Sequence, residues 1–156
     1  MSNYQSLELR INGERRKVSA DPASPLVFVL RNHLGLTGTK LGCGLEQCGS
    51  CAVLVDGTSR MSCTLSVGDV VERDIVTVEG VGARAVGARL RKAFADASAA
   101  QCGYCIPGIV VALTALFEVE RKPDDATIRA ALEPHLCRCG SHQAVLRAAR
   151  AMAADQ

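Results

Sequence analysis

The chain has 156 residues, 48% of them hydrophobic and 22% charged, so it is long enough to bury a core as one domain or as two small ones. Aromatic residues make up only 3% of the chain, Trp is absent, and the net charge is +2. Nucleic-acid binding needs stacking side chains or a basic surface. We therefore expect a globular protein whose partners do not include nucleic acid.

No transmembrane segment is expected. The longest apolar run, residues 109–117, is much shorter than the roughly 20 residues of a membrane span. The N-terminal residues lack the apolar stretch of a signal peptide, which predicts a cytoplasmic location, with any membrane association made through partners. Disulfides rarely persist in a reducing compartment. The eight cysteines therefore indicate metal binding.

The first half of the chain has the pattern of strands and tight turns. Asn12-Gly13 and Asp56-Gly57 are two-residue hairpin signals. Alternating or β-branched side chains predict strands over residues 7–11, 15–18, 51–55 and 74–79. Residues 25–33 predict a short helix, and residues 35–51 a loop rich in Gly. These elements together predict a small α+β domain with a mixed sheet.

After Gly80-Val81-Gly82 the composition changes, and Ala, Leu and Arg dominate. Helices are predicted over residues 85–97, 107–120, 125–132 and 143–153. Four helices with short connections indicate a bundle. We therefore expect two domains, residues 1–80 and 81–156, each of which carries four cysteines.

The first four cysteines have the spacing C-x4-C-x2-C-x11-C: Cys43, Cys48, Cys51 and Cys63. Plant-type [2Fe–2S] ferredoxins use C-x4-C-x2-C followed later by a fourth Cys. Cluster sulfurs must accept backbone N–H hydrogen bonds, and the glycines of this loop let the backbone approach closely. This spacing favours an iron–sulfur site over a disulfide framework, a structural zinc site or buried free cysteines.

The second four have the spacing C-x2-C-x31-C-x1-C: Cys102, Cys105, Cys137 and Cys139. The C-x2-C pair also occurs in redox dithiols and zinc sites, whereas the C-x1-C pair is unusual for zinc. A di-iron centre could take both pairs, one per iron or in a similar arrangement. Pro107 suits the first turn of a helix, so we expect the C-x2-C pair at a helix N-terminus, where the dipole favours negative charge. A free-standing ferredoxin with a helical zinc-binding appendage, or a thiol-rich protein without metal, remains an alternative.

Three motifs together resemble the small iron–sulfur subunit of the xanthine dehydrogenase/aldehyde oxidoreductase (molybdenum hydroxylase) family over nearly the whole chain. They are GCGLEQCGSC at residues 42–51, QCGYCIPG at 101–108 and LCRCG at 136–140. The resemblance implies a ferredoxin-like β-grasp domain followed by a four-helix bundle, with one [2Fe–2S] cluster in each. It also implies a large partner subunit that carries molybdenum on a molybdopterin cofactor.

The resemblance further implies an oxidoreductase subunit that transfers electrons and does no substrate chemistry itself. The bundle cluster would lie nearest molybdenum, with Gln101 at the position that contacts the pterin. The ferredoxin-like cluster would pass electrons to a cytochrome or a flavin protein. Ile106 replaces a Thr common in the family, and the Cys139-Gly140-Ser141-His142 ending is more like isoquinoline- and nicotinate-type dehydrogenases. The partner's substrate would then be an N-heteroaromatic compound or an aldehyde.

Four further residues have less specific expectations. His33, His135 and His142 are expected to be surface or loop-packing residues. Arg138 lies between two candidate ligands, where it could stabilise an anionic cluster or be solvated.

Overall fold

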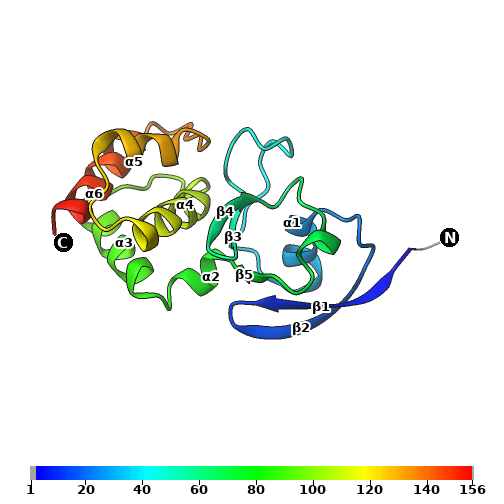
Figure 1. Ribbon diagram of the computed structural model, residues 1–156. Coiled ribbons are helices and arrows are strands. Elements are labelled where there is room, and N and C mark those ends of the chain that lie inside the picture. The colour runs from blue at the N-terminus through cyan, green and yellow to red at the C-terminus, as the bar shows by residue number, and fades with distance from the viewer. Residues whose placement is uncertain (1–2, 156) are drawn as a thin grey trace.

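The computed structural model describes residues 3–155, and Figure 1 shows a sheet-containing half beside a helical half. The sheet has five strands in the order β2-β1-β5-β3-β4. β1 and β5 run parallel, whereas the other neighbouring pairs are antiparallel, which confirms the expected mixed sheet and α+β class. The strands are β1 (Gln5–Ile11), β2 (Glu14–Ala20), β3 (Ala52–Val55), β4 (Thr58–Met61) and β5 (Asp74–Val76).

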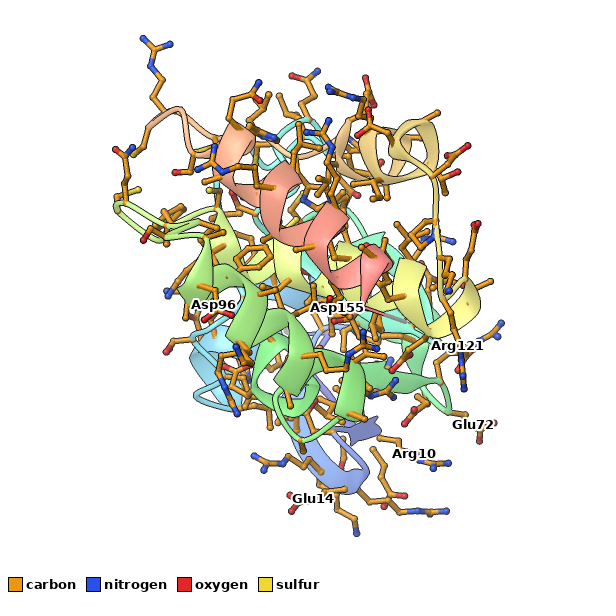
Figure 2. The ribbon with its side chains drawn as sticks, turned by 90° about the vertical axis from the view of Figure 1, so that its left-hand side faces the viewer. Arg10, Glu14, Glu72, Asp96, Arg121 and Asp155 are labelled. Carbon is orange, nitrogen blue, oxygen red and sulfur yellow. The ribbon has the colours of Figure 1, made fainter. Side chains whose placement is uncertain are left out.

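The helical half contains the four expected helices, each within one residue of its predicted ends. Ile109 and Leu113 are fully buried in the core that these helices share. Figure 2 looks onto this half, where the two helices that end near the labelled Asp96 and Asp155 lie side by side. The four helices are α3 (Ala85–Asp96), α4 (Ile106–Val119), α5 (Asp125–Leu132) and α6 (His142–Ala154).

Four shorter helical segments lie in the sheet-containing half and after its last strand. The first two form one run that confirms the helix predicted over residues 25–33, while the last two were not predicted. They are α1 (Leu26–Phe28), η1 (Val29–His33), η2 (Val67–Val70) and α2 (Val78–Val81). Of these, η1 is a π-helical turn that continues α1, and η2 is a 3-10 turn.

The strand predicted over residues 74–79 is wrong in its second half, because β5 ends at Val76. The side chain of Asn12 accepts the Thr77 N–H (2.9 Å) and donates to Thr77 Oγ1 (3.0 Å). The backbone N–H of Thr77 is therefore not available to pair with a neighbouring strand. The carbonyl oxygen of Thr77 accepts the Gly80 N–H (2.9 Å), and this hydrogen bond closes the first turn of α2. The predicted domain boundary between residues 80 and 81 falls within α2 and stays a prediction.

β3 and β5 are buried on both faces of the sheet, since successive side chains of a strand point to opposite sides. Val53 and Ile75 pack on one side against the run formed by α1 and η1. On the other side Leu54 and Val76 pack against Val111 of α4. Helix α4 therefore belongs to the helical core and also covers the sheet. No helix within residues 3–155 is long and apolar enough to span a membrane.

Both predicted hairpin turns are present. Asn12 and Gly13 join β1 to β2 with φ values of 54° and 83°, and Asp56 and Gly57 join β3 to β4 with 49° and 80°. Asn, Asp and Gly are the residues that adopt this left-handed backbone most readily. This explains why the two dipeptides are reliable turn signals.

Candidate metal centres

The loop that precedes β3 directs backbone N–H groups at cysteine sulfurs. Cys43 Sγ accepts the N–H groups of Leu45 (3.3 Å) and Gln47 (3.2 Å), and Cys48 Sγ accepts the N–H of Cys43 (3.3 Å). Gly44 makes the turn with φ 70°. Such a set of amide donors stabilises negative charge on sulfur, and the residues present therefore fit an anionic cluster.

Side chains from outside the loop hold its start in place. Arg31 of η1 donates to the carbonyl oxygens of Thr37 and Thr39, both at 2.8 Å. The Gly38 N–H donates to Glu79 Oε1 of α2 at 2.8 Å. These three bonds join the loop to η1 and α2.

Within the first quartet, the thiol pKa values of Cys43 and Cys51 are shifted in opposite directions. The Leu45 N–H and the other amide donors lower the pKa of exposed Cys43, which lies beside Cys48, to about 7. Burial is the main cause that raises the pKa of Cys51 to about 12, and the neighbouring Cys63 thiol raises it further. Metal coordination deprotonates a thiol outright, so a bound cation would overcome the cost of ionising Cys51.

The second quartet also consists of two pairs, but each pair joins the two motifs. Cys102 Sγ and Cys139 Sγ lie 3.3 Å apart, and Cys105 interacts with Cys137. The interacting sulfurs therefore come from different motifs, and how the four thiolates divide between two irons stays a prediction. The reason is that the turn before α4 and the loop before α6 face each other, so that each sulfur meets a partner from the opposite loop.

The second quartet repeats the contrast in pKa. A hydrogen bond from the Tyr104 N–H is the main cause that lowers the pKa of the exposed Cys102 thiol, and a side-chain hydrogen bond with Cys139 adds to it. Burial is the main cause that raises the pKa of Cys105 to about 12, and the neighbouring Cys137 thiol raises it further. Cys105 is the N-cap residue of α4, as expected, whereas Cys102 lies in the turn before it.

In both quartets, thiols of different pairs also influence one another: Cys48 acts on Cys51, and Cys102 acts on Cys105. Within the part of the chain that the structure describes, no group of three or more His, Cys, Asp and Glu side chains is arranged around a single metal ion.

Direct bonds join the two cysteine loops to each other. The Leu136 N–H donates to the carbonyl oxygen of Cys48 (3.0 Å), and the Tyr104 hydroxyl donates to the carbonyl oxygen of Leu41 (2.6 Å). Leu136 immediately precedes Cys137 and Tyr104 immediately precedes Cys105. The two candidate centres are therefore held in one continuous block of structure.

His135 packs between the same loops and is a loop-packing residue, as expected. Its side chain lies against Gly49 and it is only 3% exposed, while its carbonyl oxygen bonds to His142 Nε2 (2.7 Å). Burial, followed by the neighbouring His142, lowers the pKa of His135 to about 4. The ring is therefore neutral at physiological pH, although the backbone of Gly49 acts on the pKa in the opposite direction.

The other candidate residues lie on the surface. Gln101, which directly precedes Cys102, is exposed, as are Arg138 in the C-x1-C pair and His33 at the end of η1. Sequence reasoning missed Tyr104, Leu136 and Gly108 as contacts between the loops. Their only signal is their position beside the cysteines, because a hydrogen bond between two loops leaves no periodic pattern.

Two family models cover most of the chain. Residues 9–79 match a 2Fe-2S iron-sulfur cluster binding domain, and residues 77–150 match a [2Fe-2S] binding domain. Both models name a [2Fe–2S] cluster, so the second match favours iron over the alternatives of a zinc-binding appendage or a metal-free protein. The chain carries two [2Fe–2S] domains.

Relatives of known name extend over almost the whole chain. A nicotinate dehydrogenase subunit of Pseudomonas putida is 43% identical over 145 residues, which cover 93% of this chain and 92% of the relative. The xanthine dehydrogenase iron-sulfur-binding subunit of Escherichia coli O157:H7 is 38% identical over 143 residues, which cover 90% and 89%. The crystal structure of quinoline 2-oxidoreductase from Pseudomonas putida 86 matches with a TM-score of 0.89 and 31% identity, over 98% of this chain and 96% of that one. The chain therefore belongs to the small iron–sulfur subunits of the xanthine dehydrogenase/aldehyde oxidoreductase (molybdenum hydroxylase) family, whose role is electron transfer.

Proposed function

We propose that this chain is the electron-transfer subunit of a heteromeric molybdenum hydroxylase or dehydrogenase. A large partner subunit would hold molybdenum on a molybdopterin cofactor and oxidise an N-heteroaromatic compound or an aldehyde. The names of the nicotinate and quinoline enzymes favour the heteroaromatic class. The expected cytoplasmic location, with any membrane association made through partners, stays a prediction.

Two sets of four thiolates would hold the clusters. In the first, the pairs Cys43/Cys48 and Cys51/Cys63 would each bind one iron, and in the second the pairs Cys102/Cys139 and Cys105/Cys137. When bound, each cluster supplies a one-electron carrier whose potential depends on hydrogen bonds to sulfur and on solvent exposure. The amide donors to Cys43 and Cys48 supply the first of these influences directly.

The hydrogen bond from Leu136 N–H to Cys48 O is the single observation that carries the proposal (3.0 Å). It joins a candidate ligand of the first quartet to the residue beside Cys137, a candidate ligand of the second. Electron transfer between two carriers requires that they be close and fixed in position. A backbone bond between the two loops meets this need, and two independent metal-binding domains would not require it.

The order that we propose for the two centres is the one that the family resemblance implies. We place the second quartet next to molybdenum, where exposed Gln101 would contact the pterin. The first quartet would then face the acceptor, a cytochrome or a flavin protein, through the exposed loop around Cys43.

The order can be tested in the purified complex with two serine variants. In Cys43→Ser, substrate should still reduce the second cluster, while transfer to the acceptor stops. In Cys102→Ser, substrate should leave the first cluster oxidised even though dithionite can reduce it. Both variants should keep about two irons per chain, and Val119→Ser, at an 88% exposed position, is the matched control with unchanged turnover.

The opposite pattern would contradict the order. If substrate reduced the first cluster of Cys102→Ser at the wild-type rate, the second quartet would not lie between molybdenum and the first. If either variant kept about four irons, the substituted cysteine would not be a ligand.

A further inference from the structure

Helix α4 meets the first cysteine loop at a point where only glycine fits. Gly108 is buried in the first turn of α4 and lies against Gly49 and Ser50. A Cβ at Gly108 would stand 3.0 Å from the Gly49 carbonyl carbon and 3.1 Å from Ser50 Cα, and nearer still to the Gly49 oxygen. All three are backbone atoms, so no side-chain rotation can make room.

Gly49 itself also lies close to a side chain, the ring of His135. Gly49 has φ 71°, a conformation that suits glycine. A Cβ there would stand 2.6 Å from Cγ and 2.8 Å from Cε1 of the buried His135 ring. The backbone at Gly49 therefore lies in close contact with both the first turn of α4 and this imidazole, and we call Gly49, Gly108 and His135 the clasp.

This clasp contains one residue from the neighbourhood of each cysteine motif. Gly49 directly follows Cys48, Gly108 comes three residues after Cys105, and His135 comes two residues before Cys137. Any change in the width of the clasp would therefore move the motifs relative to one another.

We infer that Gly49, Gly108 and His135 are positioning residues that fix the separation between the two cysteine quartets and hence the coupling between their clusters. The inference rests on the ligand assignment proposed above. A larger residue at Gly108 would push the start of α4, with Cys105, away from the first loop. The clusters would keep their ligands but interact more weakly.

The test uses the full chain with both clusters assembled and reduced by dithionite. The spin–spin interaction between two reduced clusters falls steeply with their separation, so their EPR spectrum reports the spacing. Gly108→Ala should keep the wild-type iron content and both EPR signals but lose spin–spin splitting. Gly82→Ala is the matched control, because a Cβ there has its nearest neighbours at 3.8 Å. Wild-type splitting in Gly108→Ala at full iron content would overturn the inference.

A second variant decides the matter if Gly108→Ala loses iron or fails to fold. His135→Ala only removes atoms from the clasp, so it introduces no clash. It should speed amide hydrogen exchange at Leu136, whose N–H bonds to Cys48, and reduce the splitting. Unchanged exchange and splitting would refute the positioning role. Failure of the proposed function is distinguishable, because it would appear in the wild-type chain as missing iron or a missing EPR signal.

Discussion

Leu113 is fully buried at the centre of the core that the four long helices share. Leu113→Ala removes three carbons from this core and leaves a cavity, which costs about 2–5 kcal/mol in the free energy of unfolding. At about 1.4 kcal/mol for each factor of ten, the unfolding equilibrium constant should rise roughly 30-fold to several thousand-fold. Since Cys105 caps the same helix, the second cluster should also be lost at lower denaturant concentration than the first.

The assay is denaturant unfolding of the full chain, followed by far-UV circular dichroism and by the visible absorption of the clusters. Val119→Ala is the control on the same helix, because Val119 is 88% exposed and should change the free energy of unfolding by no more than about 0.5 kcal/mol. The slope against denaturant must stay constant for the comparison to hold. A loss below about 1 kcal/mol in Leu113→Ala would refute the view that α4 is the centre of this core.

Two further predictions concern hydrogen bonds outside the cysteine loops. Asn12→Ala removes two hydrogen bonds to Thr77 and places Ala at φ 54°, so the free energy of unfolding should fall by about 1–3 kcal/mol. Asn12→Asp keeps an acceptor for the Thr77 N–H, so it should lose less. Equal losses for the two variants in a urea titration would contradict this prediction. Arg150 is the first cause of the low pKa of Asp125, about 2, so Arg150→Gln should raise that pKa in an NMR titration. This depressed pKa stabilises the folded state above the usual Asp value of 3.8, and the contribution is lost as the pH falls toward 2; an unchanged pKa would show that the pair does not form in solution.

The sequence predicts the local elements well because their signals are local. The helix ends follow from Pro107 and the Ala-rich composition, and the hairpins from Asn12-Gly13 and Asp56-Gly57. The first cysteine spacing predicts one [2Fe–2S] domain, the resemblance of the three motifs implies a second, and the family models confirm both.

The features that the sequence did not predict all depend on contacts between residues that are distant in the chain. The strand over residues 74–79 is cut short by Asn12, which is 65 positions away from Thr77. The burial of β3 on both faces comes from α4, a helix that the sequence assigns to the other domain. The sulfur pairs in the second quartet arise because two loops face each other, and spacing within a motif carries no information about this.

EPR spectroscopy of the reduced full chain, with iron and sulfide counted on the same sample, tests the central claim most directly. The account predicts two distinct [2Fe–2S] signals, with about four irons and about four sulfides per chain. A single signal with about two irons per chain would contradict it, because one of the two cysteine quartets would then hold no cluster.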